Sequence, residues 1–365
     1  FYLSMKIEAK TLVTPDMVKP TRKNFRMRGV FNPSAVRLKN RKILLYARVA
    51  ETPYHDEKTF LAPRCCGTHK LEWQIEKLSR RKMTLAPDYF WLSDEISRLP
   101  TISHFRKILL DKSGLEVEKV SDKPDFYGIR DDGDFGVEDP RITYLKNENK
   151  YAMTYVSVSL HSGVSTSLAT SKNLNSWKRE GIIFRQQNKD VVIFPEKING
   201  YYVALHRPEG TMIFSKPSIW ISYSKDLLFW GRDRPLLDPR NHAWDYLRIG
   251  AGTVPLKTDE GWLEIYHGVK LTKKRDPDSH KIYMAGALLF DLKNPAKVIG
   301  RTRAKEPLFG PDLDSEKKGF NDKVVFPSGL VQTSDKKSVL IYGGGADTVI
   351  TVRKMSIKSV LNSMK

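Results

Sequence analysis

The chain has 365 residues, with 62 Lys or Arg against 42 Asp or Glu, which gives a formal net charge of +20. No stretch approaches the ~18 consecutive apolar residues of a membrane-spanning helix, and this excludes a helical membrane protein. The two cysteines, Cys65 and Cys66, are adjacent, so a disulfide framework is excluded as well. With no long apolar leader at the start, these features predict a cytoplasmic protein.

The basic charge raises the question of nucleic-acid binding. Lys and Arg are spread along the whole chain, and the short clusters at residues 80–82 and 273–275 lie in no basic–aromatic motif. Solubility and attraction of small anions explain the charge at least as well. We therefore expect neither a nucleic-acid partner nor a membrane partner.

Strand signals recur in chain order, each with a proline, a polar turn and a short apolar run. The prolines are Pro33, Pro140, Pro195, Pro255 and Pro327, and the apolar runs cover residues 42–46, 151–155, 202–206, 262–266 and 338–342. Because proline lacks an N–H donor, it is tolerated where a strand begins. Each unit is therefore predicted to be an antiparallel meander that opens at its proline.

Two of these units share a longer string. Residues 169–177 read ATSKNLNSW, and residues 222–230 read SYSKDLLFW. Self-similarity at a long period is typical of repeat folds. Five copies predict an all-β protein, a five-bladed β-propeller that occupies residues 1–365 as a single domain. A β-sandwich with coincidental similarity is the alternative.

Two segments depart from this repeat. The stretch from about residue 71 to residue 109 lengthens the gap between the first two units, and we expect an insertion of helices or loops in the first blade. Residues 354–365 read KMSIKSVLNSMK, with apolar residues at helical spacing, which predicts a C-terminal helix.

The inner strands of a propeller end near its central axis, so residues at equivalent positions in the blades should converge there. Those positions carry polar or charged side chains: Arg48, Asp139, Arg141, His206, Arg207, Tyr266, His267 and Asp347. Buried polar groups require partners or a function. Their convergence indicates an active-site pocket.

Several motifs at these positions are recognisable. Residues 136–141 read GVEDPR, residues 205–208 read LHRP, residues 248–252 read RIGAG, and residues 345–348 read GADT. In this order they resemble the motifs of glycoside hydrolase family 130, the mannoside phosphorylases and β-mannosidases. The resemblance extends from about residue 29 to residue 352. It implies a five-bladed β-propeller, in agreement with the repeat.

The resemblance also implies an inverting attack on a β-mannosidic bond, in which inorganic phosphate releases α-mannose 1-phosphate. Asp139 matches the general acid, which in this family is thought to act through a sugar hydroxyl. An inverting displacement requires an acid on one face of the sugar and a nucleophile on the other. The structural alternative for Asp139 is a salt bridge to Arg141.

Phosphate is already anionic, so a phosphorylase requires cations to hold it rather than a second carboxylate as base. The candidate phosphate ligands are Lys189, Arg248 and His267, with Tyr266 beside them. Arginine binds phosphate through two parallel hydrogen bonds, while lysine and protonated histidine act as point charges. The family pattern has lysine where this chain has Arg248, which keeps the charge. The alternative is that these are solvated cations and a structural histidine.

The remaining candidates would hold the mannosyl unit through its hydroxyl groups: Asn32, Arg48, Arg141, His206, Arg207 and Asp347. We expect no metal, because the acidic loop at residues 131–134 lacks the glutamate of an EF-hand. Inorganic phosphate is expected as co-substrate, with no cofactor. The expected partner is a β-mannose-containing oligosaccharide, and a homo-oligomer is left open.

Phosphorolysis is favoured over hydrolysis because the cationic positions are kept, whereas hydrolytic members of the family lose them and gain glutamates. Glu209 is a departure from the family pattern, and it could activate water in a β-mannosidase. A carbohydrate-binding propeller without activity is the second alternative. An acid placed opposite a phosphate site argues against it.

Overall fold

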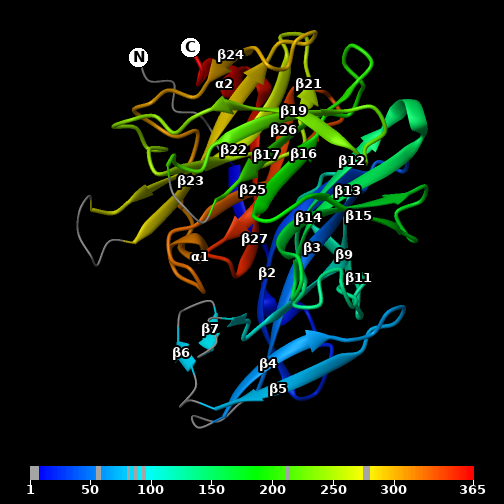
Figure 1. Cartoon of the computed structure of the whole chain (residues 1–365). Coiled ribbons are helices and arrows are strands. Elements are labelled where there is room, and N and C mark those ends of the chain that lie inside the picture. The colour runs from blue at the N-terminus through cyan, green and yellow to red at the C-terminus, as the bar shows by residue number, and fades with distance from the viewer. Residues whose placement is uncertain are drawn as a thin grey trace.

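The structure is a computed structural model that describes residues 8–54, 59–79, 83–85, 89–92, 96–210, 214–273 and 280–365. Five antiparallel sheets form the five blades of a β-propeller, so the predicted fold is confirmed (Figure 1). None of the described helices is long and apolar enough to cross a membrane.

The first two blades follow one another in the chain. Blade 1 contains β2 (Phe25–Arg37), β3 (Ile43–Pro53), β9 (Ile102–Leu110) and β10 (Val117–Val120), with β11 (Phe126–Tyr127) paired to β9. Blade 2 contains β12 (Val137–Leu145), β13 (Lys150–Ser159), β14 (Gly163–Ser171) and β15 (Lys178–Phe184). In both blades the first strand is the innermost.

The next two blades repeat this order. Blade 3 contains β16 (Asn188–Ile193), β17 (Tyr202–Pro208), β18 (Ile219–Ser224) and β19 (Trp230–Leu237). Blade 4 contains β20 (Arg248–Gly250), β22 (Trp262–Leu271), β23 (Lys281–Phe290) and β24 (Val298–Arg301), with β21 (Leu256–Lys257) paired to β22. A short helix, α1 (Asp314–Lys317), precedes the last blade.

Blade 5 is built from both ends of the described chain. Its strands are β25 (Val325–Gln332), β26 (Ser338–Gly345), β27 (Val349–Ser356) and β1 (Glu8–Val13). Pairing of β1 with β27, in which Glu8 lies opposite Lys354, closes the ring of blades. Buried aliphatic and aromatic side chains between neighbouring blades form the core.

The predicted apolar runs all fall in the second strands of the blades, but the prolines do not occupy one common position. Pro33, Pro140 and Pro327 lie within the innermost strands β2, β12 and β25, whereas Pro195 and Pro255 follow β16 and β20. In β2 and β12 the proline coincides with a break in strand register, where its missing N–H is not needed.

The repeated string has a structural cause at the turn that follows β14 and β18. The Ser171 hydroxyl accepts hydrogen bonds from the N–H groups of Asn173 and Leu174. The Ser224 hydroxyl accepts the corresponding pair from Asp226 and Leu227. The repeated letters therefore specify one turn that is used twice, because such side-chain oxygens replace backbone acceptors in turns.

The insertion in blade 1 consists of strands and loops in its described part, which corrects the expectation of helices. β4 (Phe60–Cys65) pairs with β5 (Trp73–Leu78), and β6 (Met83–Leu85), β7 (Phe90–Leu92) and β8 (Ser97–Arg98) form a small sheet; both lie at the lower end of Figure 1. The third strand of the blade, β9, also falls within the predicted insertion. In β5 the apolar residues Trp73 and Ile75 are two positions apart, which is the spacing of a strand.

The C-terminal helix α2 (Ile357–Asn362) is shorter than predicted. Its N-cap is Ser356, whose hydroxyl accepts a hydrogen bond from the Ser359 N–H at 3.0 Å. Residues before this cap belong to β27, so the helix cannot start at residue 354.

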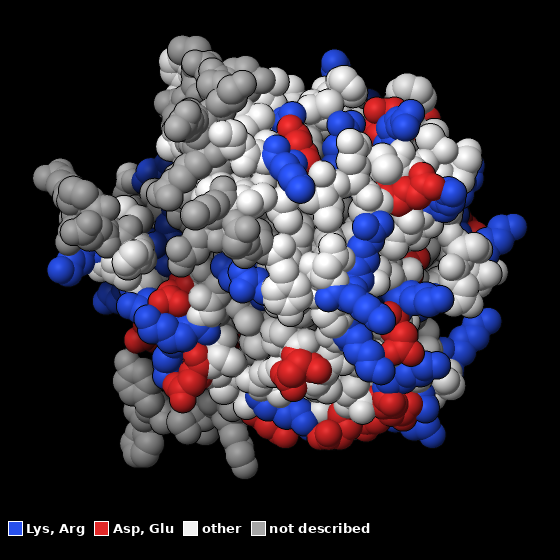
Figure 2. Space-filling model, turned by 90° about the horizontal axis from the view of Figure 1, so that it is seen from below, with Lys and Arg blue, Asp and Glu red and all other residues white. Residues whose placement is uncertain are grey.

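Figure 2 shows how the charged side chains are distributed over one face of the molecule. Over its described part, lysine and arginine side chains lie interspersed with carboxylates. The positive charge of this face is thus divided into small groups rather than gathered into one field.

Candidate active site

Polar residues in the left-handed backbone region mark the inner ends of four blades. Asn32 (φ 45°), Asp139 (φ 50°) and Asp190 (φ 57°) each lie at a register shift of an innermost strand, and Asp347 (φ 49°) follows β26. Asn and Asp tolerate this region better than other non-glycine residues. A bulge redirects the side chain it carries, and these four side chains line one cavity.

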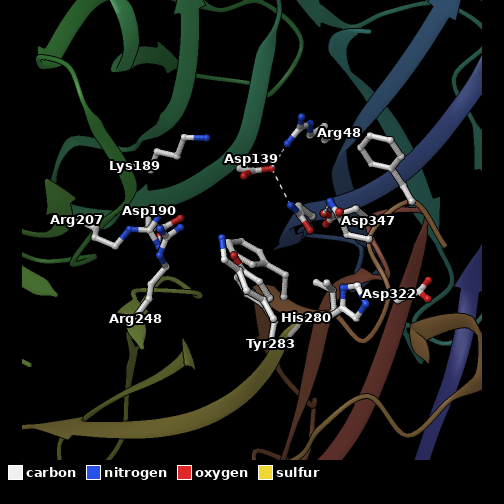
Figure 3. A pocket seen from close by; sticks show the side chains of 16 residues that line it. Arg48, Asp139, Lys189, Asp190, Arg207, Arg248, His280, Tyr283, Asp322 and Asp347 are labelled. Carbon is white, nitrogen blue, oxygen red and sulfur yellow. Dashed lines mark hydrogen bonds and ion pairs between the residues drawn. The ribbon is translucent and has the colours of Figure 1, made fainter. Parts of the chain in front are cut away.

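The cavity has a volume of about 690 Å³ (Figure 3). Seven of the predicted site residues line it: Asn32, Arg48, Asp139, Lys189, Arg207, Arg248 and Asp347. Nine further residues complete the lining, and sequence reasoning did not select them: Asp190, His280, Lys281, Tyr283, Phe320, Asn321, Asp322, Val324 and Phe326.

Asp139 lies between the two sides of this cavity (Figure 3). Its Oδ1 accepts a hydrogen bond from Asn32 Nδ2 at 2.9 Å and lies 3.2 Å from Arg48 Nη1. Burial by itself would raise the pKa of Asp139, but the charges of Arg48 and Arg141 together with the Asn32 hydrogen bond lower it. Asp139 is therefore an ionised carboxylate at neutral pH in this structure.

Three cations form one wall of the cavity (Figure 3). Arg207 Nη1 lies 2.6 Å from Asp190 Oδ2, and Lys189 Nζ lies 3.7 Å from Glu138. Arg248 comes from the first position of β20. Since the three cations come from blades 3 and 4, a single anion between them would contact two blades at once.

Glu209 bridges two of these cations from behind. Its Oε1 lies 2.8 Å from Arg207 Nη2, and its Oε2 lies 3.5 Å from Arg248 Nη2. Glu209 lines a neighbouring cavity. It pairs with two arginines and is absent from the described lining of the cavity that contains Asp139.

His267 also lies behind the cationic wall, which corrects the expectation of a protonated histidine on the anion. Arg207 Nη1 donates a hydrogen bond to its Nε2 at 3.0 Å. Complete burial, together with the nearby charges of Arg207 and Arg141, holds the pKa of His267 well below its usual value. His267 is therefore neutral and supports Arg207.

Tyr266 faces away from the pocket. Its hydroxyl donates a hydrogen bond to Asp245 Oδ2 at 2.7 Å, and its ring lies 5.5 Å from that of Trp244. Successive residues of a strand point to opposite faces of the sheet. Tyr266 and His267 therefore cannot both face the anion, and Tyr266 belongs to the packing of blade 4.

Arg141 and His206 are buried outside the pocket lining. Arg141 donates to the backbone carbonyls of Gly252 and Asp139, so it braces the bulge rather than pairing with the Asp139 carboxylate. His206 contacts Asn188 at 3.0 Å and stacks on Phe184 at 4.5 Å between ring centroids. Neither side chain lines the cavity that contains Asp139.

The opposite wall carries carboxylates. Asp347 Oδ2 accepts a hydrogen bond from Asn321 Nδ2 at 2.8 Å, and Asp322 and Phe320 line the cavity next to them. Residues 320–322 lie in the segment between α1 and β25, and no other connection between blades in the described ranges contains an α-helix. No repeat signal could identify them in the sequence. Carboxylates and amides of this kind are suited to sugar hydroxyl groups.

Comparisons with known proteins agree with this geometry. Residues 109–365 match the sequence profile of glycoside hydrolase family 130, described as beta-1,4-mannooligosaccharide phosphorylase. The beta-1,2-mannobiose phosphorylase of Listeria innocua is 37% identical over 366 residues, which cover 99% of this chain and 98% of that protein. The 1,2-beta-oligomannan phosphorylase of Thermoanaerobacter sp. is 39% identical over 69% of this chain and 78% of that protein.

A solved structure gives the same result. The Listeria innocua beta-1,2-mannobiose phosphorylase in complex with beta-1,2-mannobiose superposes with a TM-score of 0.86 at 35% identity, over 99% of both chains. Profile, sequence and fold thus agree over most of the molecule, and the chain belongs to glycoside hydrolase family 130.

Proposed function

We propose that the protein is an inverting β-mannoside phosphorylase, which transfers a mannosyl unit to inorganic phosphate and forms α-mannose 1-phosphate. The observation that carries the proposal is the position of Asp139, between a wall of three cations and a wall of carboxylates in one cavity (Figure 3). A phosphate on the cationic wall and a mannosyl unit beside Asp347 would bring nucleophile, anomeric carbon and acid together.

The substrate we propose is a β-1,2-linked mannoside. The relative that matches almost the whole chain is named beta-1,2-mannobiose phosphorylase. A beta-1,4-mannooligosaccharide phosphorylase of Ruminococcus albus is 34% identical over only 49% of this chain. Full-length similarity includes the loops that line the pocket, so it favours the β-1,2 linkage.

In the proposed reaction, a phosphate oxygen attacks the anomeric carbon while the bond to the leaving sugar oxygen breaks. That oxygen takes a proton that comes from Asp139, directly or through a sugar hydroxyl group. The carboxyl group must be protonated first, and the surrounding cations oppose protonation. A bound phosphate dianion offsets those cations, so we expect the pKa of Asp139 to rise when phosphate binds.

Lys189, Arg207 and Arg248 are the proposed phosphate ligands, with His267 and Glu209 positioning the arginines. Asn32, Arg48 and Asp347 are proposed to hold the mannosyl hydroxyl groups. Hydrolysis would require a base that activates water. Because Glu209 is engaged by two arginines outside the pocket lining, its geometry favours phosphorolysis.

The test is release of sugar from β-1,2-mannobiose and β-1,4-mannobiose with and without inorganic phosphate. We expect mannose 1-phosphate only when phosphate is present, and faster from the β-1,2 isomer. Free mannose at the same rate without phosphate would identify a hydrolase instead. Equal rates on both isomers would overturn the proposed linkage and leave the reaction type unaffected.

A further inference from the structure

A second cavity adjoins the catalytic pocket and shares Arg248 and Lys281 with it. It has a volume of about 590 Å³. His206, Glu209, Trp220 and Asp233 line it, mainly from blade 3. The roles proposed above leave His206 and Trp220 without a function, although His206 lies next to Arg207 in the sequence.

The cavity contains a buried hydrogen-bond donor that has no partner in the part of the chain that the structure describes. His206 is 2% exposed, and its Nδ1 lies 3.0 Å from Asn188 Nδ2, which can only donate. Nδ1 therefore accepts, and Nε2 carries the hydrogen. Among the described residues no hydrogen-bond acceptor lies within reach of that Nε2, since Asp233 Oδ1 is 3.8 Å away.

A buried acceptor belongs to the same hydrogen-bonded pair of residues. Asn188 Oδ1 is likewise buried and has no partner within the described ranges. Buried polar groups in native proteins are almost always paired, so each exception requires an explanation. One ligand that both donates and accepts would satisfy both atoms, and the hydroxyl groups of a sugar do so.

His206 offers its hydrogen bond without a charge. Burial lowers the pKa of His206 to about 4, although Asp233 pulls in the other direction. The imidazole is therefore an uncharged donor near neutral pH, and the carboxylates of Glu209 and Asp233 lie in the same cavity. Lys216, Arg248 and Lys281 line it as well, so the charges of the cavity are mixed in sign and His206 contributes an uncharged donor among them.

Trp220 adds an aromatic surface. It lies opposite His206 in the β17–β18 pair, with ring centroids 6.4 Å apart. An aromatic ring next to hydrogen-bonding groups presents an apolar face and polar edges together, which matches the two kinds of surface of a hexose.

We propose that this cavity is a second sugar-binding site, which takes a neutral hexose unit of a mannooligosaccharide through His206, Asn188 and Trp220. The identity of the hexose rests on the proposed function. The unit is either a distal residue of the chain that occupies the catalytic pocket or part of a separate molecule. Both sources present the same hydroxyl groups, and the experiment below distinguishes them.

The experiment is calorimetric titration of the Asp139→Asn protein, which binds without turnover, with β-1,2-mannobiose and β-1,2-mannotetraose. Trp220→Ala and His206→Phe are added to this background; phenylalanine keeps the stack on Phe184 and removes the donor. Tyr223→Ala is the matched control, because Tyr223 is also in β18 and lines a different cavity.

A distal unit of the same chain predicts that Trp220→Ala weakens mannotetraose binding by roughly tenfold and leaves mannobiose binding unchanged. A separate molecule predicts two mannobiose sites, of which Trp220→Ala removes one. The proposal is overturned when both variants match the Tyr223→Ala control within about twofold for both sugars.

Phosphate-dependent turnover of mannobiose by the unaltered protein separates this inference from the proposed function. If turnover is absent while Trp220→Ala still weakens sugar binding, the proposed function fails and the second site stands. If turnover is present and both variants match the control, only the second site fails.

Discussion

The two walls of the catalytic pocket differ in charge and in construction. The cationic wall is carried by strands β16, β17 and β20; Asp190 pairs with Arg207 within the cavity lining, and Glu209 and His267 brace the arginines from behind. The carboxylate wall is carried by loops, with Asp347 after β26 and residues 320–322 before β25. Opposite charges suit different substrates, an anion on one wall and a neutral polyhydroxyl group on the other.

The difference in construction indicates which half of the site can vary. Side chains on paired strands are held precisely, whereas loops accept substitutions and insertions more readily. A nucleophile that is the same for every sugar substrate suits the rigid wall of paired strands. Sugars that differ in linkage suit the loop wall.

The largest expected effect is at the junction between the walls. Asp139→Asn removes the proposed proton donor, and we expect kcat for phosphorolysis to fall by roughly 10²–10⁴-fold. Asparagine tolerates the left-handed backbone at this position. Sugar binding measured by calorimetry should persist. Asp335→Asn, in an exposed turn, is the control, and activity of Asp139→Asn within tenfold of the unaltered protein would contradict the assignment.

The next effect isolates the cationic wall. Each charge-assisted hydrogen bond contributes about 1.5–3 kcal/mol, so Lys189→Gln and Arg248→Gln should each raise KM for phosphate by roughly 10- to 100-fold. KM for the mannoside should change much less. The measurement is initial rate against phosphate concentration, with Lys257→Gln as control, because Lys257 pairs with Glu196 on the surface. Equal changes in both KM values would mean that the walls do not act separately.

Asp347→Asn gives the reciprocal result on the carboxylate wall. The substitution keeps the shape of the side chain and removes its charge, so we expect KM for the mannoside to rise about tenfold, as the loss of one strong hydrogen bond requires. KM for phosphate should stay within twofold. A rise confined to KM for phosphate would place Asp347 with the cations instead.

The smallest expected effect concerns Glu209. Glu209→Gln keeps one acceptor for the two arginines, and kcat for phosphorolysis should stay within about threefold of the unaltered protein, because Glu209 is not a base in the proposed reaction. A base for water would lose roughly 10²–10⁴-fold on the same change. Parallel assays of mannose and mannose 1-phosphate distinguish the two outcomes.

The sequence predicted the blade number and the second strands because the turn and strand signals recur in every unit. The sequence also pointed to Asn32, Asp139 and Asp347, which are polar residues that line the cavity at the inner ends of their blades. Asp190 is the counterpart of Asp139, but the prolines do not reveal it: Pro140 directly follows Asp139, whereas Pro195 lies after the end of β16, away from the register shift that carries Asp190. Residues such as Tyr283 and Asn321 have no repeated equivalent and became visible only in three dimensions.

The alternation of side chains along a strand explains two further differences between the predicted site and the structure. Tyr266 and His267 were predicted to share one role, but neighbours in a strand face opposite ways. His206 and Arg207 differ in the same manner, and this places His206 in the second cavity. The two-residue period of a strand therefore assigns the two members of each pair to opposite faces of the sheet.

The pairing of β1 with β27 has a consequence for how the protein is made. Asp347 lies between β26 and β27, so one wall of the pocket depends on a blade whose strands come from opposite ends of the described chain. Domains begin to fold while they leave the ribosome, yet this blade cannot close until residues 349–356 have emerged and met residues 8–13. Blades 1 to 4 can form earlier from contiguous segments. A partly synthesised chain would therefore expose Asp139 and the cationic wall without the carboxylate wall, and activity should arise only at ring closure.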